Sequence, residues 1–178
     1  GCKIMKFIFK VVLIGDGAVG KTSIRRQYMG EGFRADFLAT MGADFAYLKT
    51  KVEENEIEWQ IWDLAGQPAF RNVMKAYYRG SMGALAVYDV TQPKTLDSID
   101  SWVSDAREHS ESETEMPVVV VGNKIDLRPE VPNSLKTNQG FEKAKTINAD
   151  FVETSAKTGE AIEKAFAKLA LRILATNK

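Results

Sequence analysis

The sequence is poor in cysteine and histidine, the two residue types that most often crosslink a small protein or bind a structural metal. Its 178 residues include one cysteine, Cys2, and one histidine, His109. A single cysteine excludes an internal disulfide, which fits a reducing compartment, and these two residues alone cannot form a metal cluster. We therefore expect His109 to be a solvated surface residue.

An excess of one charge and any long apolar run are also absent. Lys and Arg number 24, and Asp and Glu number 24, so the net charge is zero. A balanced charge argues against binding to nucleic acid or anionic membranes through the overall field of the protein. No apolar run approaches the length of about 20 residues that spans a bilayer, and no secretory signal pattern occurs. We expect a cytoplasmic protein without a nucleic-acid partner, whose contact with a membrane, if it has one, is peripheral.

The length and composition favour one domain that spans residues 1–178. Apolar residues make up 44% and charged residues 27% of the chain, which is ordinary for a globular protein with a well-buried core. The sequence has no internal repeats, linkers or low-complexity segments. We expect this domain to be a monomer.

A glycine-rich segment with the spacing G-x-x-x-x-G-K-T follows the first apolar run, residues 7–14. Between a strand and a helix, this spacing indicates phosphate binding by backbone N–H groups, assisted by the partial positive charge of the helix N-terminus. Lys21 can reach the terminal phosphates and the Thr22 hydroxyl can bind Mg²⁺. An ordinary glycine-rich turn is the disfavoured alternative, and the motif alone does not select one nucleoside triphosphate. The predicted phosphate loop comprises Gly15, Asp16, Gly17, Ala18, Val19, Gly20, Lys21, Thr22 and Ser23.

Runs typical of strands alternate with runs typical of helices along the rest of the chain. Strands are expected at 7–14, 44–51, 57–62, 84–90, 117–122 and 151–154, and helices at 23–29, 68–79, 95–111, 139–148 and 160–175. The two alternating runs around the polar turn at 53–56 predict an antiparallel hairpin at a sheet edge. Lys10 interrupts the first strand, and we expect it near an exposed end. The whole pattern predicts a doubly wound α/β fold, which binds ligands outside the carboxyl ends of its strands.

Four polar motifs follow predicted strands and should therefore meet at one edge of the sheet. Besides the phosphate loop they are Asp63-x-x-Gly66, Asn123-Lys-x-Asp126 and Ser155-Ala-Lys157. Because a carboxylate only accepts hydrogen bonds, Asp126 matches the N1–H and 2-amino donors of guanine and would be left unpaired by adenine. The Lys124 stem can lie along the base, and the Ala156 N–H can donate to the guanine O6.

The segment from Asp63 to Gln67 carries groups suited to a γ-phosphate. Asp63 would hold Mg²⁺ through a water, the Gly66 N–H could approach the phosphate closely, and Gln67 could orient an attacking water. Thr40, in an irregular loop, could supply a second hydroxyl to Mg²⁺ and close that loop only when the γ-phosphate is present. A solvated loop threonine is the alternative for Thr40.

As a set, these motifs resemble those of small Ras-superfamily GTPases, and most of all the Rab family, over nearly the whole chain. The motifs are Gly15-Asp-Gly-Ala-Val-Gly-Lys-Thr-Ser23, Thr40-Met-Gly-Ala-Asp-Phe45, Trp62-Asp-Leu-Ala-Gly-Gln67, Tyr77-Tyr-Arg-Gly80, Val87-Tyr-Asp-Val-Thr91, Asn123-Lys-Ile-Asp-Leu127 and Glu153-Thr-Ser-Ala-Lys157. The resemblance implies a six-stranded, mostly parallel sheet with one antiparallel edge strand, five helices, and a GTP/GDP cycle on Mg²⁺.

The resemblance also implies roles for individual residues and partners. Thr40 corresponds to the switch I threonine, residues 63–79 to switch II, and Phe33 to the aromatic that packs on guanine. Phe45, Trp62 and Tyr77 correspond to a hydrophobic patch that effectors read, with ordinary core residues as the alternative. Effector, exchange-factor and activating proteins are the implied partners, in membrane traffic or related signalling.

Three departures from the family pattern stand out. Pro68 follows Gln67 where relatives carry Glu, and it should push Gln67 towards an extended backbone and narrow the motion of switch II. Phe37 replaces a frequent Tyr and offers no hydroxyl to the γ-phosphate. The tail lacks the cysteine of a prenyl anchor, which indicates either a truncated tail or a divergent, for example prokaryotic or archaeal, relative. Two other functions stay open: a nucleotide kinase or ATPase, and a nucleotide-bound scaffold without turnover.

Overall fold

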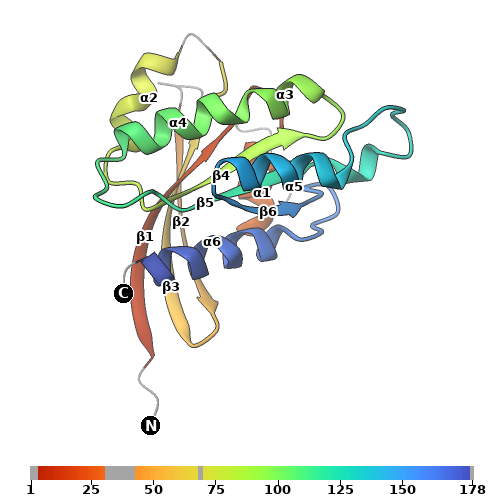
Figure 1. The fold of residues 1–178 in the computed structure, drawn as a ribbon. Coiled ribbons are helices and arrows are strands. Elements are labelled where there is room, and N and C mark those ends of the chain that lie inside the picture. The colour runs from red at the N-terminus through yellow and green to blue at the C-terminus, as the bar shows by residue number, and fades with distance from the viewer. Residues whose placement is uncertain (1–3, 31–42, 68–69, 177–178) are drawn as a thin grey trace.

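Six strands form one mixed sheet in the order β2-β3-β1-β4-β5-β6 in the computed structural model, which describes residues 4–30, 43–67 and 70–176 (Figure 1). The strands are β1 (Met5–Ile14), β2 (Ala43–Val52), β3 (Asn55–Leu64), β4 (Gly83–Asp89), β5 (Val118–Asn123) and β6 (Asp150–Glu153). Only β2 runs antiparallel to its neighbour, β3, and the other paired strands are parallel. The predicted α/β fold, with one antiparallel edge strand, is confirmed.

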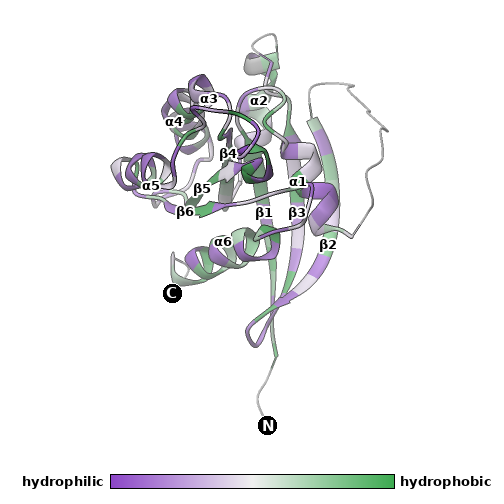
Figure 2. Cartoon of the chain, turned by 90° about the vertical axis from the view of Figure 1, so that its right-hand side faces the viewer, coloured by the Kyte–Doolittle hydropathy of each residue, from purple (hydrophilic) through white to green (hydrophobic). Residues whose placement is uncertain are grey.

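Helices cover both faces of the sheet (Figures 1 and 2). The helices are α1 (Lys21–Tyr28), α2 (Arg71–Tyr78), α3 (Pro93–Asp97), α4 (Ile99–His109), α5 (Thr137–Thr146) and α6 (Ile162–Thr176), with a short 3₁₀ turn, η3 (Ile125–Leu127). Helices α1 and α6 bury their apolar residues on one face, and α2 to α5 bury theirs on the other. The sheet is therefore enclosed between two helical layers, as a doubly wound fold requires.

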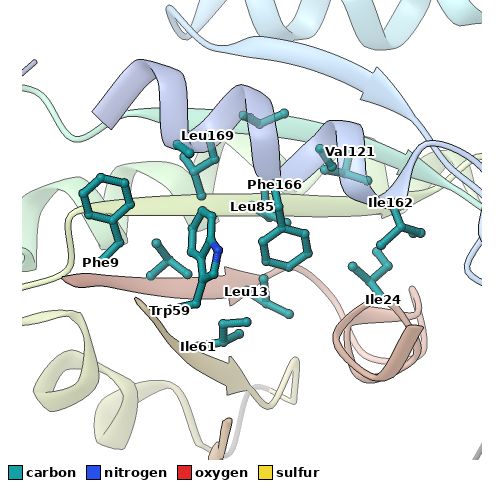
Figure 3. Close-up of a cluster of buried hydrophobic side chains, with 14 of the residues drawn as sticks. Phe9, Leu13, Ile24, Trp59, Ile61, Leu85, Val121, Ile162, Phe166 and Leu169 are labelled. Atoms are coloured by element: carbon teal, nitrogen blue, oxygen red, sulfur yellow. The ribbon is translucent and has the colours of Figure 1, made fainter. Parts of the chain in front are cut away.

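The apolar pattern of each strand explains its place in the sheet. All residues of β4 and β5 are buried, because both strands are central and are covered on both faces. The outer hairpin alternates instead: the β3 residues Ile57, Trp59 and Ile61 face the α6 side of the core. On that side Trp59 packs against Phe166 of α6 (Figure 3), and the two ring centroids are 5.4 Å apart.

Several element boundaries differ from the sequence expectations. The β2–β3 turn needs only two residues, with Glu53 in the left-handed region at φ 55°, so β3 starts earlier and runs on through Asp63 to Leu64. The expected helix at 95–111 is two helices separated by Ser98. Ser98 has helical dihedrals, so α3 and α4 follow one another without a loop and together make one of the five predicted helices.

Two expectations about single residues are wrong. Lys10 lies in the middle of β1, paired with Gln60, rather than at an exposed end, and its Nζ donates to the Arg79 carbonyl at 2.5 Å. His109 is partly buried instead of fully solvated, because its ring stacks on Tyr78 with centroids 6.5 Å apart. None of the helices in the described ranges has the length and apolar character that crossing a bilayer requires.

Candidate nucleotide-binding site

The four polar motifs lie at one edge of the sheet, where β1, β3, β4, β5 and β6 end. Gly15 follows β1 directly, and β3 ends beside it, since Leu13 pairs with Asp63. Asn123 ends β5 and pairs with Asp89, the last residue of β4. This convergence follows from the parallel topology, because parallel strands all present their carboxyl ends on the same side.

The glycine-rich loop folds around the Lys21 ammonium. Lys21 Nζ donates to the Gly15 and Asp16 carbonyl oxygens, each at 2.8 Å. Burial lowers the pKa of Lys21 to about 8, although the nearby carboxylates of Asp63 and Asp16 act in the opposite direction. A buried ammonium whose partners in the described residues are neutral carbonyls leaves room for an anion to compensate its charge, so the donor set fits a phosphate.

Backbone conformation explains why glycine occupies the ends of this loop. Gly15 has φ 140° and Gly20 has φ 104°, which other residues rarely adopt. A Cβ at Gly15 would also overlap the Val87 carbonyl of β4. Gly17, by contrast, faces open space, since a Cβ added there would meet no atom within 4 Å.

A hydroxyl and a carboxylate meet beside Lys21. Thr22 Oγ1 donates to Asp63 Oδ2 at 2.5 Å, and burial raises the pKa of Asp63 above its usual value while the Thr22 hydrogen bond opposes this shift. Two hard oxygen ligands with phosphates to complete the shell are the donor set that Mg²⁺ favours. Within the described ranges no group of three or more His, Cys, Asp or Glu side chains could hold a metal.

The segment after Asp63 packs directly on the phosphate loop. A Cβ added at Gly66 would overlap the Gly17 backbone nitrogen and the Asp16 carbonyl carbon, so only glycine allows this approach. Gln67 follows with an exposed side chain, and its carbonyl accepts from the Phe70 N–H at 3.1 Å. The structure thus brings Gly66 and Gln67 to the loop that is predicted to hold the phosphates.

The Asn123 side chain joins the predicted base-binding turn to the phosphate loop. Asn123 is 1% exposed, and its Nδ2 donates to the Val19 carbonyl at 3.0 Å. Its Oδ1 accepts from Thr154 Oγ1 at 3.0 Å and from the Ala156 N–H at 3.1 Å. Ser155 Oγ donates to Asp126 Oδ1 at 2.8 Å. Three separate segments are therefore held together around one buried amide.

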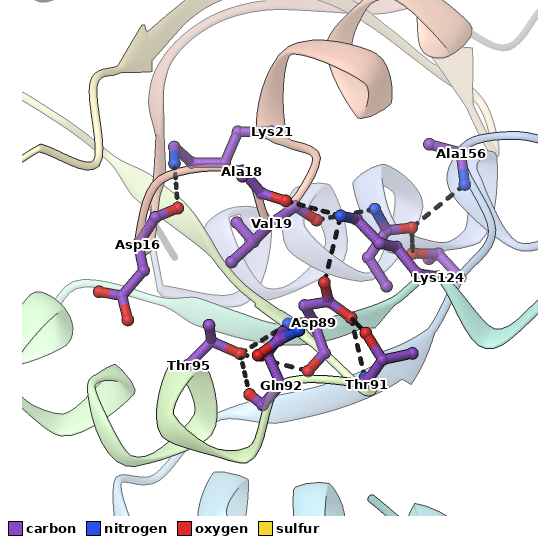
Figure 4. Close-up of polar contacts among 12 residues, drawn as sticks. Asp16, Ala18, Val19, Lys21, Asp89, Thr91, Gln92, Thr95, Lys124 and Ala156 are labelled. Carbon is purple, nitrogen blue, oxygen red and sulfur yellow. Dashed lines mark hydrogen bonds and ion pairs between the residues drawn. The ribbon is translucent and has the colours of Figure 1, made fainter. Parts of the chain in front are cut away.

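Lys124 makes a second connection to the same loop, shown in Figure 4. Its Nζ donates to the Ala18 carbonyl at 2.7 Å and pairs with Asp89 Oδ2 at 3.1 Å. The backbone of Lys124 is left-handed, at φ 70°, which turns the side chain back over the loop. Asp89 is itself fixed, because its Oδ1 accepts from the Thr91 N–H at 2.8 Å and from the Thr91 hydroxyl at 2.6 Å.

Sequence reasoning assigned no role to four residues at this edge, although Asp89 and Asp44 stand within motifs quoted for the family resemblance. Asp89 could have been found by the signal that located the other motifs, a polar residue at the end of a buried strand. Arg25 and Asp44 form an ion pair at 2.8 Å beside Asp63, and Trp102 Nε1 of α4 donates to Asp16 Oδ1 at 2.9 Å. These contacts join residues far apart in sequence, and no local pattern marks them.

Five sequence-predicted positions are not placed at this edge by any contact. Thr40, Phe33, Phe37 and Pro68 lie outside the described residues, and Lys157 is exposed. The expected effects of Pro68 and Phe37 therefore stay predictions.

The three aromatics of the predicted effector patch lie side by side. The Phe45 and Trp62 ring centroids are 4.8 Å apart, and those of Trp62 and Tyr77 are 5.1 Å apart. Phe45 is 46% exposed, whereas Trp62 and Tyr77 are partly buried against the α2–α5 side of the core. The patch is thus partly core and partly surface, and its reading by effectors stays a prediction.

The fold and the phosphate loop define a P-loop nucleotide-binding domain. Residues 10–175 match the model of the Ras family, and the chain belongs to that family. It is 37% identical over 172 residues to Ras-related protein Rab-8B of Homo sapiens, a match covering 97% of this chain and 81% of that protein. It is 41% identical over 167 residues to Ras-related protein RABA6b of Arabidopsis thaliana, covering 94% and 71%. Ras-related protein Rab-8A of Gallus gallus is 39% identical over 173 residues, covering 97% and 82%. The chain is a Ras-family GTPase homologous to Rab proteins.

Proposed function

We propose that this protein is a switch that binds GTP on Mg²⁺, hydrolyses it slowly to GDP, and changes its contacts with partner proteins accordingly. The observation that carries the proposal is the pair of side chains, Asn123 and Lys124, that tie the base-binding turn to the Val19 and Ala18 carbonyls of the phosphate loop. A nucleotide has its base and phosphates at opposite ends, so a site for it needs these two regions at a fixed separation.

Asp126 and the backbone N–H of Ala156 would recognise the guanine base. Ser155 Oγ orients the Asp126 carboxylate by donating to its Oδ1 at 2.8 Å, which leaves the carboxylate free to accept further bonds from the N1–H and 2-amino groups of guanine. The Ala156 N–H can donate to the guanine O6, and Ser155 and Lys157 flank it. Adenine lacks the paired donors, so it would leave a carboxylate unpaired at a desolvated site.

Residues 15–23 would bind the phosphates of the nucleotide. Lys21 can exchange its carbonyl partners for phosphate oxygens, and Thr22 with Asp63 would hold Mg²⁺, joined by Thr40 from switch I. Bound there, Mg²⁺ would neutralise phosphate charge. Lys21 adds a second cation, buried where its electrostatic effect is strong.

Hydrolysis requires one water to be oriented towards the γ-phosphate. The exposed amide of Gln67, next to Gly66 on the phosphate loop, is the group of this chain that we assign to that task. Gly17 leaves open space in which the glutamine, or an arginine from a partner, can reach the reacting phosphate. Because the described residues place no arginine side chain beside Gly17, we expect unassisted turnover on the order of 10⁻⁴ to 10⁻³ per second.

Switch I around Thr40 and switch II from 63 to 79 would read the γ-phosphate and present Phe45, Trp62 and Tyr77 to effectors. Exchange factors and activating proteins would act on the same segments. Relatedness to Rab proteins supports a role in membrane traffic, with peripheral association at a membrane.

The experiment that tests guanine recognition replaces Asp126 with Asn. An Asn amide can donate to the 2-carbonyl of xanthine and accept from its N1–H, so Asp126→Asn should lose GDP affinity by at least about 100-fold and gain affinity for xanthosine diphosphate. Competition of both nucleotides against a fluorescent GDP analogue measures this. Asp97→Asn, an exposed position on α3, serves as the control and should leave both affinities unchanged. Unchanged GDP binding by Asp126→Asn would place base recognition elsewhere.

A chromatographic assay of the bound nucleotide, before and after loading with GTP, separates a switch from a scaffold. A switch exchanges its nucleotide and converts GTP to GDP, whereas a scaffold retains one nucleotide unchanged.

A further inference from the structure

Arg25 is an almost fully buried cation at the edge of the proposed metal site. It lies on α1 one turn after Thr22, and its side chain is 7% exposed. Its Nη2 pairs with Asp44 Oδ2 at 2.8 Å, and its Nε lies 3.8 Å from Asp63 Oδ2. Within the described residues that buried Nε has no hydrogen-bond partner, so part of the donor capacity of the guanidinium faces the site unused.

The oxygen that Arg25 faces is the one that Thr22 also contacts. Asp63 Oδ2 accepts from Thr22 Oγ1 at 2.5 Å, and the side chain of Asp63 is 6% exposed. A buried carboxylate needs a compensating charge. Arg25 supplies one from within the chain, on the side of Asp63 that faces β2.

A fixed cation beside a metal ligand also repels the metal. The interaction of two charges a few ångströms apart stays substantial at the effective dielectric of a partly buried site. Arg25 therefore lowers the free energy of the metal-free site and raises that of the site once a divalent cation is bound. Both effects weaken the affinity for the metal.

We propose that Arg25 is a built-in counter-charge that weakens Mg²⁺ binding in the nucleotide complex and so eases nucleotide release when Mg²⁺ leaves. The inference rests on the Mg²⁺ site of the proposed function. Asp44 holds the guanidinium in place from the start of β2, immediately after the segment of the sequence that contains Thr40. The same ion pair thus connects the phosphate-loop helix with the end of switch I.

The competing explanation is that Arg25 merely ties α1 to β2. The two explanations predict opposite changes in the affinity for Mg²⁺ when Arg25 is replaced. Removing a repelling charge strengthens Mg²⁺ binding, whereas removing a structural tie loosens Thr22 and Asp63 and weakens it.

The test measures the dissociation rate of a fluorescent GDP analogue over a series of buffered free Mg²⁺ concentrations, together with Mg²⁺ calorimetry on the GDP complex. The midpoint is the free Mg²⁺ concentration at which the dissociation rate lies halfway between its values without Mg²⁺ and at saturating Mg²⁺. Two neutral variants, Arg25→Met and Arg25→Gln, should each lower this midpoint by about tenfold. Arg25→Lys keeps the charge and should stay within about threefold of the unmodified protein. Arg172→Gln is the control for net charge, because Arg172 pairs with Asp150 at the start of β6, at the opposite end of the sheet.

A midpoint that is unchanged or higher in the neutral variants overturns the proposal in favour of the structural tie. If neither neutral variant folds, Asp44→Asn decides the question, because an Asn amide oxygen can still accept from Arg25 and so keeps the tie, while the loss of the Asp44 charge leaves Asp63 alone to balance the guanidinium. The midpoint should then rise by about threefold, and an unchanged or lower midpoint contradicts the counter-charge. If the rate of nucleotide release from the unmodified protein does not depend on Mg²⁺ at all, the Mg²⁺ site of the proposed function is contradicted. This result differs from an unchanged midpoint in the variants.

Discussion

Among single residues, most of the buried polar side chains gather at the edge of the sheet where the strands end. Lys21, Arg25, Asp63, Asp89 and Asn123 are all less than a tenth exposed. Burying such groups is unfavourable unless each finds a partner. Lys21 finds its partner within the phosphate loop, and the other four do so through a contact with a residue from another segment. A protein selected only for stability would fill these positions with apolar residues, so their concentration here marks the site.

Gln67 differs from these residues because its side chain is exposed, so its amide can hydrogen-bond to water and needs no partner within the protein. We expect Gln67→Leu to slow single-turnover GTP hydrolysis by about tenfold or more, since leucine cannot hydrogen-bond a water, while GTP affinity stays within about twofold. Phosphate release after loading with GTP gives the rate, and competition binding gives the affinity. An unchanged rate would move water positioning to another residue.

Among the elements, α5 packs closely on the sheet through a glycine. Gly140 faces the sheet, where a Cβ would overlap both the Tyr88 hydroxyl of β4 and the Phe151 ring of β6. That hydroxyl is buried without a hydrogen-bond partner in the described residues, and burial raises the pKa of Tyr88. The close approach of helix and strand therefore rests on the absence of a side chain at one position.

Gly140→Ala should lower the free energy of unfolding by roughly 1–3 kcal/mol, because a methyl group is forced into a filled space. Adding Tyr88→Phe should recover part of that loss, since it removes one of the two overlapping groups and costs no hydrogen bond to the described residues. Urea denaturation of both single variants and the double variant measures the coupling, with the exposed Asn138→Ala on α5 as control. Additive losses, with no recovery in the double variant, would show that Tyr88 is not the obstacle.

For the whole molecule, the core on the α1–α6 side joins elements from both ends of the chain. Phe166 of α6 stacks on Tyr28 of α1 at 3.8 Å between centroids and meets Trp59 of β3 edge to face. Trp59 Nε1 and the Tyr28 hydroxyl both donate to Thr50 Oγ1, at 2.7 and 3.0 Å, so the polar ends of these aromatics are satisfied as well. Four elements are thus held by one aromatic group.

Phe166→Ala should lower the free energy of unfolding by about 3–5 kcal/mol, since it leaves a cavity at the centre of this group. Denaturant unfolding monitored by tryptophan fluorescence is the measurement, and Lys164→Ala, exposed on the same helix, is the matched control. A loss below about 1 kcal/mol would mean that the neighbouring side chains collapse into the space.

Much of the fold could be predicted because apolar residues recur along the chain in patterns typical of strands and helices. The β-branched valine run of β5 predicts a strand buried on both faces, and the alternation on each side of Glu53 predicts the hairpin. The break at Ser98 could not be predicted, because serine is compatible with a helix and the dihedrals there stay helical. Lys10 was misplaced because a lysine inside a strand can reach a carbonyl at the surface, which its neighbours in sequence do not reveal.

The sequence by itself determined which groups the proposed site contains, since the phosphate loop and the motifs at 63–67, 123–126 and 155–157 are each continuous in the chain. Only the tertiary structure decided how these groups are supported. Arg25 reaches Asp44, 19 positions away, and Asp63, and Lys124 reaches Ala18, 106 positions away. The physical reason is that spacing along the chain fixes which side chains a strand or helix presents together, whereas the partner of a buried charge is fixed by whichever element packs against it.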